Sequence, residues 1–174
     1  MMKIAFTLTF ALLFVLQVSA KDDILRAFEQ KWENSKEYTL QVARAMPEEH
    51  YDFKPVERQM SFKEQLFHIR DNMLRVSSKY FDPDRNYRDT IEDISRYDKE
   101  ATIKALEEGF EEAAAMADKI EEADLSGKVD FFAGGEKNIF QMLSLKHDHV
   151  THQRGQLIVY LNHQGIEPPD YRGW

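Results

Sequence analysis

SFKEQLFHIRDNMLRVSSKY, residues 61–80, is the stretch of this sequence that decides the fold. Ser61 and Glu64 have the spacing of a capping box, in which each side chain satisfies a free amide at the start of a helix. The apolar residues then advance by alternating steps of four and three: Phe62, Leu66, Ile69, Met73, Val76 and Tyr80. This spacing predicts an amphipathic helix whose apolar stripe packs against other helices.

Three further stretches have helical spacing of their apolar residues. They run from about residue 22 to 45, from about 98 to 122 and from about 138 to 163. Pro47 ends the first of them, and Gly165 is the expected C-terminal cap of the last. Four long amphipathic helices predict an all-α protein, an antiparallel four-helix bundle.

Outside these helices the strand signal is weak. Val129, Phe131 and Phe132 predict a short extended piece between the third and fourth helices, in a region with three glycines. No internal repeat, low-complexity run or long linker divides the chain. Residues 21–174 therefore have the size and organisation of one domain.

The first 20 residues have the layout of a secretory signal peptide. Lys3 precedes an apolar run from residue 4 to 18, and small residues follow up to Ala20. The run is short for a membrane span, which needs about 20 apolar residues. We therefore expect cleavage after Ala20 and export to the periplasm or the exterior, with no membrane anchor on the mature domain of residues 21–174.

Charge and cysteine content narrow the functional classes. The formal net charge is −8, and loss of Lys3 with the leader would make it −9. A chain this acidic is poorly suited to bind nucleic acid, because that requires clustered Lys and Arg. The chain has no cysteine. Cysteine nucleophiles and thiolate metal ligands are therefore excluded, and stability must come from packing rather than from disulfides.

Three histidines form the candidate site. His149 and His152 lie three residues apart in the fourth helix and share a face. Met142 and Tyr160 lie on the same face, which indicates that it packs toward the core. We therefore expect both rings to be at least partly buried. His68, in the second helix, completes the set. Neutral imidazole is a common ligand of divalent metals. Two interpretations stay open from spacing alone: the rings bind a metal, or each has a hydrogen-bond partner in the core.

Polar residues near His68 are candidates to support such a site. Asp71 and Asn72 lie one turn away and are expected to orient a ring or hold a water molecule. Glu64 is a further candidate, although its capping role competes. Gln156, on the fourth helix, has the position to hydrogen-bond near the site. The remaining histidines, His50, His147 and His163, are expected at solvent-facing or structural positions.

Two other residues of the fourth helix carry expectations. Gly155 costs about 1 kcal/mol relative to Ala in mid-helix, which suggests close approach by another helix or a ligand. Arg154 is expected to pair with a carboxylate of a neighbouring helix rather than to act in catalysis.

These residues resemble the DinB superfamily, also called the DinB/YfiT-like proteins, over essentially the whole mature chain. The resemblance rests on His68 within residues 67–73, on residues 149–156 and on residues 159–169. It implies a four-helix bundle with a three-histidine site for a divalent ion. His68 and His149 match that pattern. The usual third position falls on Gln153, a poor ligand for zinc-like ions, so we favour His152 as the third ligand.

The resemblance implies a metal-dependent enzyme acting on an unknown small molecule. Its two expected chemistries are hydrolysis by an activated water and transfer of a low-molecular-weight thiol. Export favours hydrolysis, since thiol cofactors are mainly cytoplasmic. Imidazole ligands suit zinc, nickel, copper and iron alike. No catalytic residue is assigned.

Two alternatives to an enzyme remain. One is an exported, non-catalytic bundle that binds a metal or small ligand, with its apolar stripes available for a homodimer. The other is a purely structural bundle with ordinary core histidines.

Overall fold

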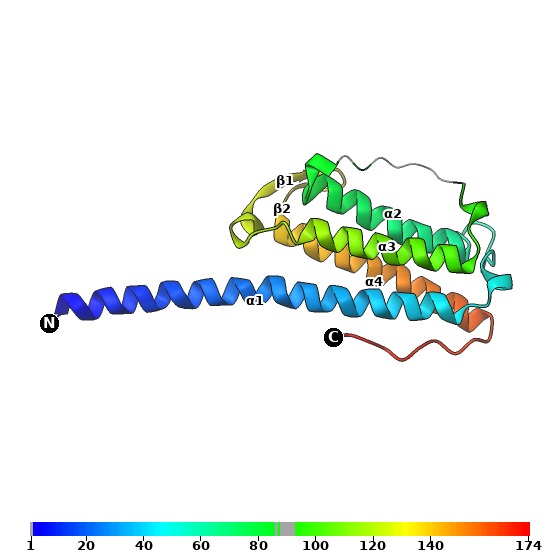
Figure 1. Ribbon diagram of the computed structural model, residues 1–174, viewed down its shortest axis with the longest axis horizontal. Coiled ribbons are helices and arrows are strands. Elements are labelled where there is room, and N and C mark those ends of the chain that lie inside the picture. The colour runs from blue at the N-terminus through cyan, green and yellow to red at the C-terminus, as the bar shows by residue number, and fades with distance from the viewer. Residues whose placement is uncertain (1, 86, 88–92) are drawn as a thin grey trace.

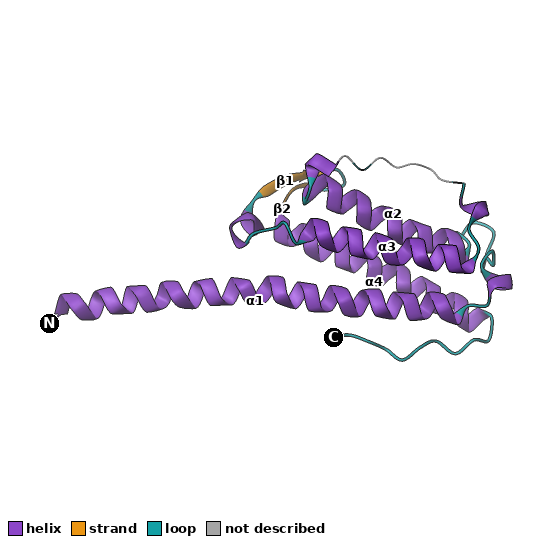
Figure 2. Ribbon diagram, in the orientation of Figure 1, coloured by secondary structure: helices purple, strands orange, loops and turns teal. Residues whose placement is uncertain are grey.

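Four helices make up the bundle. The computed structural model describes residues 2–85, 87 and 93–174, with side chains from residue 23 onward. Its helices are α1 (Met2–Ala45), α2 (Phe62–Tyr80), α3 (Lys99–Ala117) and α4 (Ile139–His163) (Figures 1 and 2). The predicted all-α four-helix bundle is confirmed. Helices α2 and α4 lie close to their expected residues, whereas α1 begins at Met2 rather than near residue 22.

Each helix has one parallel and one antiparallel neighbour. The neighbouring pairs are α1 with α3 and α4, and α2 with α3 and α4. Figure 1 shows α1 and α4 running in one direction and α2 and α3 in the other. Because α2 and α3 are consecutive but parallel, the end of α2 and the start of α3 lie at opposite ends of the bundle.

Local capping explains where the helices begin and end. The capping box predicted for α2 is present: the Ser61 amide donates to Glu64 Oε2 at 2.5 Å, and the Glu64 amide donates to Ser61 Oγ at 3.2 Å. Asn138 caps α4 in the same reciprocal way with Gln141. Gly165 has φ of +68° just beyond α4, which confirms it as the C-terminal cap.

The connection between α3 and α4 differs in detail from expectation. Helix α3 ends at Ala117, earlier than predicted, and a separate 3₁₀ helix covers Glu122–Ser126, where Glu121 and Asp124 cap each other. A two-stranded antiparallel hairpin follows, made of β1 (Lys128–Phe131) and β2 (Gly135–Asn138). The extended piece was thus predicted for β1, whereas β2 was missed because its sequence, GEKN, has no apolar alternation.

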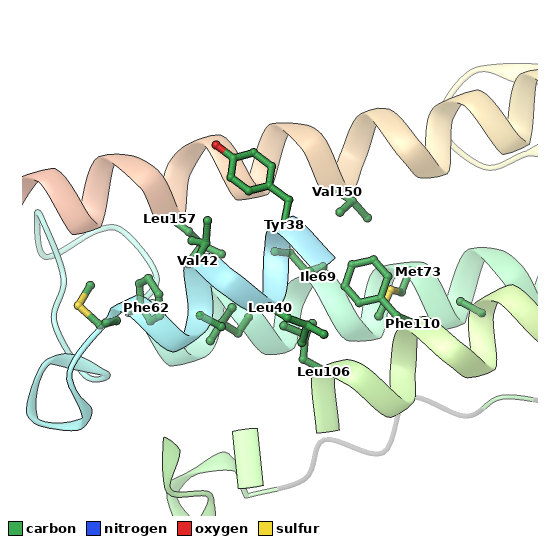
Figure 3. Packing of buried hydrophobic residues seen from close by; sticks show 14 of the residues in the cluster. Tyr38, Leu40, Val42, Phe62, Ile69, Met73, Leu106, Phe110, Val150 and Leu157 are labelled. Atoms are coloured by element: carbon green, nitrogen blue, oxygen red, sulfur yellow. The ribbon is translucent and has the colours of Figure 1, made fainter. Parts of the chain in front are cut away.

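The core is built from the apolar stripes of all four helices. Figure 3 shows Val42, Ile69, Phe110 and Leu157, one from each helix, converging in the middle of the bundle. Phe110 also contacts Trp32, with ring centroids 5.2 Å apart, and its carbonyl accepts a hydrogen bond from Trp32 Nε1 at 3.3 Å. Each such buried side chain contributes about 1.5–3 kcal/mol to stability.

The side chains of the expected leader lie outside the described residues. Within the part of the chain that the structure describes in full, no helix is long and apolar enough to cross a membrane. Leader cleavage, export and dimerisation stay predictions.

Candidate functional site

Helices α2 and α4 bring two of the three predicted histidines together. Because these helices are antiparallel neighbours, the faces that carry His68 and His149 meet. The Nε2 atoms of His68 and His149 are 3.2 Å apart, and the rings are tilted by 59° with centroids 5.0 Å apart. Both side chains are half-buried. Each ring therefore directs its Nε2 atom at the same point near the surface.

Gln153 is the third side chain at this point. Its amide nitrogen lies 3.3 Å from Nε2 of His149, and its amide oxygen accepts a hydrogen bond from Gln65, across from it on α2. Gln65 is buried, so it fixes Gln153 from the bundle side. Since the oxygen and nitrogen of an amide are assigned from the hydrogen-bond network, a half-turn of the amide would present its oxygen to His149.

His152 lies apart from this group. Its side chain is exposed, so the expectation that it is partly buried is wrong. From His149, three residues along a helix is a rotation of about −60°, and four residues is about +40°. The position of α2 favours the second direction, which is that of Gln153. His152 is near enough to His149 to act on it electrostatically. Its role as a ligand stays a prediction.

The electrostatics of the pair favour neutral imidazoles. Burial, followed by the neighbouring His68 and His152, lowers the pKa of His149 to about 4. Burial and then Arg75 lower the pKa of His68, and Asp71 partly opposes this shift. Nδ1 of His149 is buried and has no hydrogen-bond partner among the described residues. Neutral rings with converging lone pairs are the form in which imidazole binds a cation.

The supporting residues expected near His68 divide into those that act on it and those that do not. Asp71 interacts electrostatically with His68 and also accepts a hydrogen bond from the Tyr87 hydroxyl at 3.3 Å. Asn72 and Gln156 are half-buried, and neither hydrogen-bonds to the histidine pair within the described chain. Glu64 is committed to the helix cap and to Lys54, at 3.1 Å, and both interactions lower its pKa.

The donor atoms can be compared with what a metal requires. Two imidazole nitrogens bound to one tetrahedral zinc ion at about 2.0–2.1 Å lie about 3.3 Å apart. The 3.2 Å between the Nε2 atoms of His68 and His149 matches that separation. Among the described residues, however, no group of three His, Cys, Asp or Glu side chains is placed to hold a metal ion. The arrangement thus offers two imidazoles and one amide.

Arg154 and Gly155 differ from expectation. Arg154 is buried and bonds to α1, but its partners are hydroxyls and a carbonyl rather than a carboxylate: Nη1 donates to Ser35 Oγ at 2.8 Å and contacts Thr39 Oγ1 at 3.3 Å. A Cβ added at Gly155 would meet no protein atom within 4 Å, so the predicted close approach by another helix is wrong, and approach by a ligand stays a prediction. Gly155 lies on the exposed side of α4, which no other helix covers.

The sequence analysis did not predict the burial of Lys146 and His147, which lie shortly before His149 on α4. Lys146 is only 1% exposed, and its Nζ lies 3.1 Å from Ser77 Oγ and 4.0 Å from the centre of the Trp32 ring. A signal was present for Lys146, since it is four residues from both Met142 and Val150 and so continues an apolar face.

Comparison with known proteins agrees with this architecture. The family model described as the DinB family matches residues 18–173, so this chain belongs to the DinB family. The resemblance inferred from the histidine blocks is thereby confirmed. A search of curated proteins found no match.

Two solved structures have the same fold. A DinB-like protein from Bacillus subtilis is 21% identical, with a TM-score of 0.70, over 85% of this chain and 99% of the other. A DinB-like protein from Bacillus cereus is 18% identical, with a TM-score of 0.65, over 84% and 97% of the two chains. At this identity the likeness establishes the fold.

Proposed function

We propose that this protein binds a divalent metal ion, zinc, nickel or iron, through Nε2 of His68 and His149. The observation that supports this is the 3.2 Å separation of the two nitrogens, contributed by different helices. The site is half-buried, so a small molecule can reach it. A divalent ion held there supplies Lewis-acid chemistry, which makes water a better nucleophile at neutral pH.

The protein's own residues define what the site does around that ion. Gln65 holds the Gln153 amide beside His149, and Asp71 adds negative charge near His68. Together they orient the donors and favour a positive charge at the point where the rings converge. We propose hydrolysis of a small ester or amide as the reaction; transfer of a small thiol is the alternative chemistry.

The first test is metal content of untagged, full-length protein, measured by mass spectrometry. We expect about one metal ion per chain, and loss of most of it in His68→Ala and in His149→Ala, since removing one of few ligands costs at least 10–100-fold in affinity. His163→Ala is the matched control and should retain the metal. Unchanged metal content in both site variants would overturn the proposed site.

The third donor is tested by a pair of neighbouring variants. If the Gln153 amide completes the site, Gln153→Ala loses metal affinity and His152→Ala does not. If His152 is the ligand, the order is reversed. Of these two candidates the geometry favours Gln153, because its side-chain amide lies 3.3 Å from the His149 nitrogen whereas the His152 side chain is exposed.

The presence of an amide also favours a second function. A glutamine binds zinc-like ions weakly, so a non-catalytic metal-binding or ligand-binding module is the alternative. A panel of small ester and amide substrates, assayed with and without added metal, separates the two. Turnover that requires the metal and is lost in His149→Ala supports the hydrolase, whereas metal binding without turnover supports the module.

A further inference from the structure

A second candidate site lies on the opposite side of α4. His147 precedes His149 by two residues, a rotation of about 200° on a helix, so it faces α1 instead of α2. Two adjoining cavities, of about 320 and 170 Å³, lie between α1, α4 and the C-terminal residues 171–174. They share the lining residues Lys31, His147, Asp148 and Trp174, and we call the two together the tail cleft. Figure 1 shows the C-terminal segment running back beside α1.

The two ends of the tail cleft differ in chemistry. The larger cavity is mainly apolar and is lined by Ile24, Ala27, Phe28, Phe140 and Leu143. Phe140 is 46% exposed, although it is a large apolar residue. An apolar group of modest size that entered this end would remove such surface from water, which is favourable.

The smaller cavity is mainly cationic. Lys31, Arg154 and Arg172 line it, together with the carboxylate of Asp148. Lys31 Nζ lies 5.0 Å from the centre of the Trp174 ring, and neither Lys31 nor Arg172 forms an ion pair with the described residues. This end therefore favours a negative charge in a protein whose net charge is −8.

His147 stands where the two ends meet. Its side chain is only 8% exposed, and its Nε2 atom is buried with no hydrogen-bond partner among the described residues. The ring already interacts with the Lys31 backbone. A buried nitrogen without a hydrogen-bond partner destabilises the folded state, so its presence here needs an explanation. A ligand group in the tail cleft would supply the missing partner.

The surrounding charges act on the same ring. Burial, and then Lys31 and Arg154, lower the pKa of His147 to about 4, with Asp148 opposing. A bound anion would offset both cations and would accept a hydrogen bond from Nε2 in the neutral tautomer that carries its proton there. The ring would thus gain a hydrogen-bond partner. The same bound group would supply a counter-charge at the cationic end of the tail cleft.

We propose that the tail cleft binds a small amphipathic anion, with its apolar body between Phe28 and Phe140 and its anionic group at His147 and Lys31. This inference is independent of the metal site, because the two sites use opposite faces of α4.

The probe is octanoate, titrated into the full-length protein and followed by calorimetry and by the imidazole nitrogen resonances. We expect saturable binding and a resonance shift confined to the His147 ring. Octanamide, which has the same chain without the charge, should bind at least about tenfold more weakly. Octyl phosphate should bind if any anionic group suffices, and fail if the cleft selects a carboxylate.

Variants locate the binding. Lys31→Met and His147→Gln are each expected to weaken octanoate binding about tenfold, and Trp174→Ala to weaken it because the cleft loses a wall. Since His147 is buried, the surface changes Lys31→Met and Trp174→Ala keep the test valid if His147→Gln fails to fold. Lys104→Met is the charge-matched control, and His149→Ala should leave octanoate binding unchanged. Equal binding of octanoate and octanamide, unaltered binding by Lys31→Met, or no binding at millimolar octanoate would overturn the proposal.

Discussion

Lys146 is a cation inside an otherwise apolar part of the bundle. It is 1% exposed and makes no ion pair with the described residues. Its Nζ has the Ser77 hydroxyl and the Ala113 carbonyl as partners, each at 3.1 Å, and the face of Trp32 above it. Burial lowers the pKa of Lys146 to about 7, with Asp118 partly opposing. Protonating this amine in the folded state is therefore costly.

We predict that Lys146→Met stabilises the protein at pH 6, by about 1–3 kcal/mol, because a buried charge is replaced by an apolar chain of similar length. In the wild type the folded pKa, about 7, is below the unfolded value of about 10.4. Between these values the unfolded chain binds more protons, so stability rises with pH from about 7 to 10. The stabilising effect of the substitution should shrink over the same range.

Urea denaturation at several pH values measures both effects. Lys104→Met, at an exposed position on α3, is the control and should leave the pH dependence of stability as in the wild type. Parallel stability curves for Lys146→Met and the wild type between pH 7 and 10 would contradict the prediction.

Helix α4 is the element that organises the molecule's chemistry. One face presents His149 and Gln153 to α2, and the other presents His147 and Arg154 to α1. Gly155 belongs to neither face, because it is exposed and a Cβ there would meet no atom within 4 Å.

We therefore predict that Gly155→Ala stabilises the protein by about 0.5–1 kcal/mol, since Ala loses less backbone entropy than Gly in a helix and nothing obstructs its methyl group. Chemical denaturation measures the gain. Metal content should be unchanged in this variant. A loss of stability or of bound metal would show that something does approach Gly155 closely.

At the scale of the whole molecule, the parallel packing of α2 and α3 sets the shape of the bundle. Gly109 of α3 lies against α2, and a Cβ there would be 2.8 Å from Arg70 Cγ and 2.9 Å from Met73 Cε. Met73 is fully buried, so its end group has little room to move. The absence of a side chain at Gly109 allows the two helices to approach.

We predict that Gly109→Ala destabilises the protein by about 1–2 kcal/mol, because overpacking outweighs the helix propensity that Ala adds. The comparison with Gly155→Ala is internal: the same substitution in two helix interiors should change the free energy of unfolding in opposite directions. Equal stabilisation by both would mean that α2 and α3 separate at little cost.

Local patterns predicted the helices and their ends. The Ser61–Glu64 box, the Gly165 cap and the apolar stripe of residues 62–80 depend on interactions within a few residues of chain, and all three are present. The sequence also placed His68 and His149 on faces able to meet. The sequence around these two histidines predicted membership of the DinB family, and the family-model match over residues 18–173 confirms it.

Only the tertiary structure decided which neighbours these residues have. Helical spacing does not distinguish His152 from Gln153, because residues at i+3 and i+4 both lie near the face of His149. The position of α2 determines that Gln153 is the one beside His149. The burial of Lys146 and His147 likewise depends on where α1 packs. The amino-acid sequence determined the helices, since their stabilising contacts are local, whereas long-range packing determined the sites, since each site joins residues from different helices.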